Sequence, residues 1–110
     1  MQIAYNDFQK IDIRCGTIIE VRCFHKAIKP SYQLEIDFGP LGIKRSSAQI
    51  TERYDPSSLH GKQVIAVVNL PKRQIANFFS ECLVLGVCEP DGGVRLIVTN
   101  MRLDNGASVS

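Results

Sequence analysis

The sequence has few of the features that mark exported, membrane-spanning or multidomain proteins. Its longest apolar runs, such as Val64–Val68, are far too short to cross a bilayer, so no membrane insertion is expected. Residues 1–7 contain no basic segment followed by an apolar one, so we expect no signal peptide and a cytoplasmic location. The 110 residues, 45% hydrophobic and 22% charged, predict a single globular domain over residues 1–110.

The four cysteines do not follow a metal-binding pattern. Their spacings are C-x7-C and C-x5-C, neither of which is typical of zinc sites, and no histidine completes a ligand set. Cysteine at an apolar strand position behaves as a small hydrophobe, and without an export signal a disulfide framework is not expected. The sequence therefore predicts four buried thiols, at Cys15, Cys23, Cys82 and Cys88.

Motifs for catalysis are also missing. There is no glycine-rich phosphate loop, no pair of carboxylates in a shared context, and no cysteine beside a histidine that would activate it. His25 and His60 fall in separate polar loops. We therefore expect a binding protein, with no catalytic residue, no cofactor and no metal.

Strand patterns dominate what the sequence does contain. Apolar and polar residues alternate over Ile11–Cys23 and again over Tyr32–Phe38, while Gln63–Val68 is continuously apolar. Gly16 interrupts the first alternation and predicts a bend in a long strand. Further strands are expected to begin at Ile43, to cover residues 82–88, and to return over residues 94–98 after a Pro-Asp-Gly-Gly hairpin turn.

Two short helical turns complete the expected architecture. One covers Tyr5–Lys10, with Asn6 or Asp7 as the N-cap and Phe8 facing inward, and the other lies near residues 57–61. This order of elements predicts an all-β fold: a five-stranded Greek-key barrel of the oligonucleotide/oligosaccharide-binding (OB) type with short flanking helical turns. Such barrels bind ligands across their second and third strands and with their longer loops.

The connection over residues 69–80 is long for a compact domain and has an unusual composition. It carries adjacent cations, Lys72 and Arg73, and adjacent aromatics, Phe78 and Phe79. Long loops on a rigid scaffold are usually functional, and this mixture suits a surface that grips a phosphate backbone or an unfolded peptide. Neighbouring residues of an extended segment point in opposite directions, so one phenylalanine is expected inside the barrel and the other exposed. Core packing of both is the alternative.

Positive charge is concentrated in the middle of the chain. Six cations and two acids lie between residues 44 and 73, whereas the whole chain has a net charge of +2. We expect Lys44 and Arg45 to share one face of the barrel with Lys72 and Arg73. There they could neutralise phosphates or contact acidic and backbone groups of a peptide. Solvated surface charge is the alternative for any one of them.

The chain resembles the CsaA-type protein-export chaperones, small bacterial and archaeal proteins built on a stand-alone tRNA-binding domain. The matching segments are Asp7–Phe8, Ile11–Ile18, Ile36–Gly39, Gly42–Thr51, Gly61–Asn69, Arg73–Ala76, Ser80–Gly86 and Asn105–Gly106. The most specific of them is the run Lys-Arg-Ser-Ser-Ala-Gln-Ile at residues 44–50. The resemblance implies a homodimer of five-stranded barrels that binds unfolded polypeptides or preproteins and catalyses no reaction.

The resemblance also extends the set of candidate binding residues. The family motif favours a binding role for Ser46 and Gln49, whereas Ser47 is expected to stabilise its own turn. The complete candidate set is Lys44, Arg45, Ser46, Gln49, Lys72, Arg73, Phe78, Phe79 and Ser80. The wider family includes tRNA-gripping modules of methionyl-tRNA synthetases, so tRNA binding by the same face is the alternative. Those relatives carry a Ser-x-Gly-Met signature, of which this chain keeps only Ser80.

Overall fold

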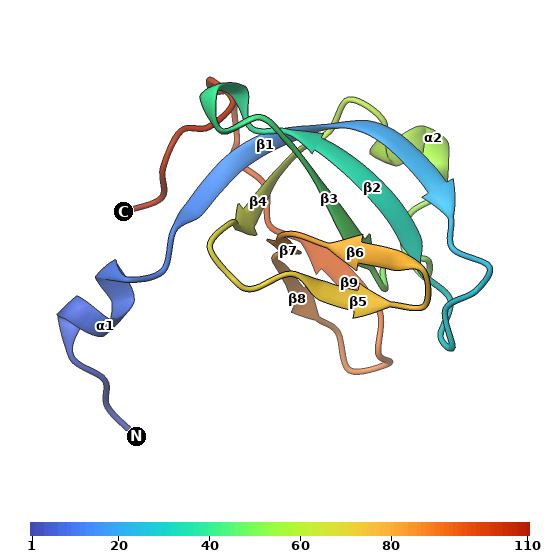
Figure 1. Cartoon of the computed structure of the whole chain (residues 1–110), viewed down its shortest axis with the longest axis horizontal. Coiled ribbons are helices and arrows are strands. Elements are labelled where there is room, and N and C mark those ends of the chain that lie inside the picture. The colour runs from blue at the N-terminus through green and yellow to red at the C-terminus, as the bar shows by residue number, and fades with distance from the viewer.

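An antiparallel five-stranded sheet forms the body of the protein and curls into a nearly closed barrel (Figure 1). The computed structural model describes all residues, 1–110. The sheet has the strand order β3-β2-β1-β4-β7. Its strands are β1 (Ile13–Cys23), β2 (Tyr32–Asp37), β3 (Ile43–Ala48), β4 (Gln63–Val67) and β7 (Leu83–Val84). The predicted all-β fold with a five-stranded barrel is therefore confirmed.

Two small hairpins and three short helices complete the fold. The hairpins are β5 (Arg73–Ile75) with β6 (Phe78–Ser80), and β8 (Gly86–Cys88) with β9 (Val94–Leu96). The helices are α1 (Tyr5–Gln9), the 3-10 helix η1 (Gly39–Leu41) and α2 (Pro56–Leu59). None of these helices is long and apolar enough to cross a membrane.

The long strand β1 joins the two halves of the barrel. Its first half pairs with β4 and its second half with β2, and Thr17 has a partner on both sides. The pairing with β2 shifts register between Ile18 and Glu20, so the bulge lies just after the predicted bend. Gly16 has a different role: a Cβ atom there would lie 2.6 Å from the Phe38 ring, so glycine lets the ring pack against the strand.

The barrel core follows directly from the alternation in β2. Tyr32, Leu34 and Ile36 are buried, while the residues between them are half-buried, as predicted. Helix α2 closes one end of the barrel with Leu59, which is fully buried. Asp55 caps this helix, because its carboxylate accepts the backbone N–H of Ser58 at 3.1 Å.

Helix α1 forms where predicted but differs in its details. It begins at Tyr5 after Ala4, and the Asp7 carboxylate accepts the backbone N–H of Ala4 at 3.0 Å, so neither Asn6 nor Asp7 is the N-cap. No residue of the helix is buried, and Phe8 is exposed instead of facing inward. Figure 1 shows the reason: α1 stands away from the barrel and has no surface of the chain to pack against.

Three further predictions are also wrong in part. Residues 69–80 are not an irregular loop, because they contain the hairpin β5–β6. Residues 82–88 do not form one buried strand: they divide into β7 and β8, and Val87 is exposed. Cys15 and Cys82 are buried as predicted, and burial raises the pKa of the Cys82 thiol to about 11. Cys23 and Cys88 are exposed.

Candidate functional site

The candidate site lies where the β5–β6 hairpin meets the outer edge of β3. Strand β3 has no neighbouring strand on that side, so its backbone groups need other partners. The backbone N–H of Glu81 donates to the Arg45 carbonyl at 2.8 Å, and the Ser80 hydroxyl accepts the Ser47 N–H at 3.1 Å. These bonds close the barrel and hold the hairpin against β3.

The two phenylalanines of the hairpin point in opposite directions, which was one of the two alternatives left by the sequence. Phe78 is 6% exposed and packs edge-to-face on Phe24, with the ring centroids 5.4 Å apart. The Arg45 guanidinium lies over the Phe78 ring, 5.0 Å from its centroid. Phe79 is 43% exposed and is available for a ligand. Phe78 therefore supports the hairpin from beneath, whereas Phe79 lies on the outer side of the hairpin, opposite Gln74.

Ser46 does not reach the surface, contrary to the binding role expected from the family motif. It is 1% exposed, and its hydroxyl donates to the Cys82 carbonyl at 3.0 Å. Its position explains this, because Ser46 pairs with buried Leu34 and so lies on the inner side of β3. Ser80 also donates to the Cys82 carbonyl, at 3.3 Å, and is half-buried. Gln49 is exposed beyond the end of β3.

The four predicted cations do not form one group. Lys44 pairs with buried Ile36 and lies in the inner row of β3, on the side opposite to Arg45. Arg45 and Lys72 come together, because each lies 3.9 Å from a carboxylate oxygen of Glu81. Arg73 is exposed and has no ion pair within the chain.

Acidic residues from other elements make this face mixed in charge. Glu35 of β2 lies directly opposite Arg45 of β3, and it pairs with Arg22 at 3.8 Å. Glu20 of β1 lines the same shallow depression as Glu35 and Arg45. The expectation of a basic face rested on charges close in sequence, whereas these acids come from β1, β2 and the segment after β6. No pattern in the sequence indicates that these acids lie beside Arg45.

Two hollows lie along the hairpin and share three residues: Ser47, Arg73 and Ile75. The first, about 180 Å³, is also lined by Leu70, Pro71, Ser80, Glu81, Cys82 and Leu83. The second, about 300 Å³, is also lined by Ala27, Ile28, Lys29, Ser31 and Gln49. Because the hollows are contiguous, they form a groove, which we call the hairpin groove. It combines apolar walls with cations and hydrogen-bonding side chains, so it is suited to an extended chain that carries both kinds of group.

Most residues that line the hairpin groove were not among the predicted site residues, and two of them carry polar groups from the loop between β1 and β2. Lys29 adds a cation from the loop between β1 and β2. Ser31 is buried, and its hydroxyl has no hydrogen-bond partner within the chain. Both lie in the loop between β1 and β2, whose only sequence signals are polarity and a proline, and neither signal indicates a binding residue.

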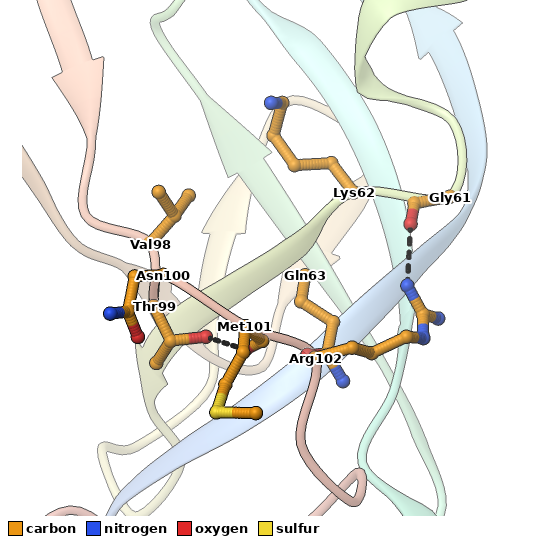
Figure 2. Close-up of a pocket in the computed structure, with 8 residues that line it drawn as sticks. All are labelled: Gly61, Lys62, Gln63, Val98, Thr99, Asn100, Met101 and Arg102. Atoms are coloured by element: carbon orange, nitrogen blue, oxygen red, sulfur yellow. Dashed lines mark hydrogen bonds between the residues drawn. The ribbon is translucent and has the colours of Figure 1, made fainter.

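Another hollow of about 310 Å³ contains none of the predicted residues (Figure 2). It lies between residues 61–63 and 98–102. Figure 2 shows Arg102 directed at the Gly61 carbonyl, with a separation of 3.3 Å. Gln63 donates to the Leu103 carbonyl at 2.6 Å, and Lys62 lies over the Tyr54 ring. Gln63 and Arg102 thus hold the C-terminal segment against residues 61–63, and we assign the functional site to the hairpin groove.

Comparison with known proteins first defines the class of this domain. The model of the family described as "Putative tRNA binding domain" matches residues 13–108. The chain therefore belongs to the tRNA-binding domain family, and its barrel is the OB-type barrel of that family.

Similar proteins of known name fall into two groups. Among solved structures, the chain resembles the chaperone CsaA of Bacillus anthracis, with a TM-score of 0.96, 47% identity and complete coverage of both chains. It also resembles the CsaA chaperone protein of Picrophilus torridus, with a TM-score of 0.94, 52% identity and coverage of 99% and 100%. Among curated proteins, the methionine–tRNA ligase of Porphyromonas gingivalis is 37% identical over 97% of this chain. The chain spans only 15% of the length of that ligase.

Proposed function

We propose that this protein is a cytoplasmic chaperone of the CsaA type that assists protein export by binding unfolded polypeptides or preproteins. The observation that supports this most directly is the hairpin groove, in a chain that is 47% and 52% identical to two full-length structural relatives named as chaperones. An extended polypeptide offers apolar side chains together with backbone donors and acceptors, and the groove offers partners for both. Leu70 and Ile75 supply apolar surface, while Arg73 and Gln49 supply polar groups.

Binding of tRNA at the same face is the second candidate function. The family assignment and the likeness to a module of methionine–tRNA ligases favour it. Lys29, Lys72 and Arg73 would contact phosphates, and Phe79 would stack on a base. The mixed charge of the face favours the polypeptide, because phosphates approaching Arg45 also approach Glu35 and Glu81.

The two candidates respond differently to salt and to substitution. We would titrate the protein with bulk tRNA and with a reduced, alkylated unfolded protein at several salt concentrations. Polypeptide binding should persist or strengthen at high salt, whereas tRNA binding should weaken linearly in log salt concentration. The Lys72→Glu/Arg73→Glu variant should lose tRNA binding with little loss of apolar polypeptide binding. If tRNA binds tightly and the polypeptide does not bind, the chaperone assignment is wrong.

Leu70 provides a sharper test of the groove itself, because it lines the first hollow and is 48% exposed. Leu70→Ser should weaken polypeptide binding roughly tenfold, because an apolar side chain of this size contributes about 1–2 kcal/mol when it is covered. Val87→Ser is the matched control, since Val87 is 60% exposed on β8 and lies outside the groove. Equal losses in the two variants would show that the polypeptide does not use the hairpin groove.

We also propose that the protein is a homodimer that covers the apolar N-terminal segment. Ile3, Tyr5, Phe8 and Ile11 are all exposed, and α1 contributes nothing to the core of its own chain. A second copy would bury these side chains and give α1 a packing partner. Sedimentation at micromolar concentration should show a dimer that Phe8→Asp dissociates. A wild-type protein that sediments only as a monomer would contradict this proposal without affecting the test of the groove.

A further inference from the structure

Glu81 lies between two cations of the candidate site that come from different parts of the chain. One carboxylate oxygen is 3.9 Å from Arg45 Nε of β3, and the other is 3.9 Å from Lys72 Nζ, which precedes β5. The Glu81 side chain is 26% exposed, whereas that of Lys72 is 69% exposed. The acid therefore lies deeper than the cation it accompanies, and a ligand that approaches Lys72 also approaches a fixed negative charge.

Backbone hydrogen bonds fix the position of this acid. The Glu81 N–H donates to the Arg45 carbonyl at 2.8 Å, and the Arg45 N–H donates back to the Glu81 carboxylate at 3.0 Å. The carboxylate thus replaces a missing strand at the edge of β3. A flexible surface acid could turn away from an incoming phosphate, but this one cannot do so without leaving a backbone donor of β3 without its partner.

We propose that Glu81 is an internal counter-anion that determines which ligands the hairpin groove accepts. Its charge offsets that of Arg45 and Lys72 and so lowers affinity for polyanions such as RNA. The affinity for an uncharged or mixed-charge polypeptide is unaffected. This inference rests on the proposed function, since it concerns ligand choice at the same groove. The structure supplies the reason: Arg73 and Lys29 line the groove without an ion pair, whereas Arg45 and Lys72 share Glu81 as their counterion.

Glu81→Gln tests the charge alone. Glutamine has the same size and keeps a carbonyl oxygen that can accept the Arg45 N–H, so the edge of β3 stays satisfied. Glu52→Gln is the matched control: it makes the same change in net charge at an exposed residue without an ion pair. We expect Glu81→Gln to bind bulk tRNA about tenfold more tightly than wild type at low salt. The slope of log affinity against log salt should steepen by roughly 0.7–0.9, the value for one more neutralised phosphate.

A double-mutant cycle separates this mechanism from a general effect of charge. Lys72→Gln should lower tRNA affinity more in the Glu81→Gln background than in wild type, because only there does Lys72 lack its counterion. Thermal melts of each variant would establish that folding is retained.

Three outcomes would overturn the inference. They are a tRNA affinity of Glu81→Gln no higher than that of Glu52→Gln, additive effects in the cycle, and undetectable tRNA binding by Glu81→Gln at low salt. Failure of the proposed function has a different signature. In that case wild type does not bind unfolded polypeptide, whatever the ratio of tRNA affinities.

Discussion

Replacing Ser46 by alanine should reduce stability without changing ligand binding. The residue belongs to a segment that the family motif associates with binding, yet it is buried on the inner side of β3. Its hydroxyl donates to the Cys82 carbonyl, which lies in the short segment between β6 and β7. The bond therefore links an edge strand to the segment that closes the barrel.

The expected loss is about 1 kcal/mol. A buried hydrogen bond between neutral groups contributes about 0.5–1.5 kcal/mol net, and removing one oxygen atom leaves little empty volume. The loss stays near the middle of this range because the Cys82 carbonyl keeps a second donor, Ser80 Oγ at 3.3 Å. If both hydroxyls are removed, the buried carbonyl has no donor. Ser46→Ala/Ser80→Ala should therefore cost about 1 kcal/mol more than the sum of the single variants.

Urea unfolding followed by circular dichroism would measure these losses. In a two-state domain of this size, Ser46→Ala should lower the midpoint at an unchanged m-value and lower Tm by roughly 4 °C. Polypeptide and tRNA affinities should stay at the wild-type values. If Ser46→Ala has wild-type stability but has lost binding, the structural role of Ser46 is wrong. If the stability losses of Ser46→Ala and Ser80→Ala simply add in the double variant, the two hydroxyls do not share the Cys82 carbonyl as their acceptor.

Two further predictions concern reactivity and acid stability. Native protein should react rapidly with an alkylating reagent at the two exposed thiols, Cys23 and Cys88, and all four thiols should react in urea. Labelling of all four thiols at equal rates in the native protein would contradict the burial pattern. Hydrogen bonds from Arg53 lower the pKa values of Glu89 and Asp91. The stability that these two carboxylates add is therefore present at neutral pH and is lost as pH falls through their folded-state pKa values. Thermal melts at neutral and acidic pH should show this loss, and Arg53→Gln should reduce it by removing the shared partner.

Local patterns were sufficient to predict most of the barrel. The period of two in β2 identifies its inward residues, because one buried face leaves only one register for the strand. The pattern also predicts a bend at Gly16 of β1. In the structure Gly16 makes room for the Phe38 ring, and the bulge lies after Ile18. Helix α2 was predictable for a similar reason, since Asp55, Pro56 and Gly61 each stabilise it locally.

Tertiary context determined what the patterns missed. The hairpin β5–β6 lacks a common turn sequence: its turn is Ala76-Asn77, and Ala76 adopts a positive φ of 54°. Helix α1 contains the aromatic residues of a buried helix, yet the chain offers it no surface to pack on. In both segments the surroundings, and not the local sequence, determine which conformation is stable.

The charges of the candidate site show which part of a binding surface a sequence can reveal. Lys44 and Arg45 are neighbours in a strand, so the same alternation that separates Phe78 from Phe79 also places these two on opposite faces. That separation was available from the sequence. The position of Glu81 was not, because 36 residues separate it from Arg45, and only closure of the barrel brings them together. Since the counterion comes from a distant segment, the charge that a ligand meets at this groove is a property of the fold, and no count over residues 44–73 can give it.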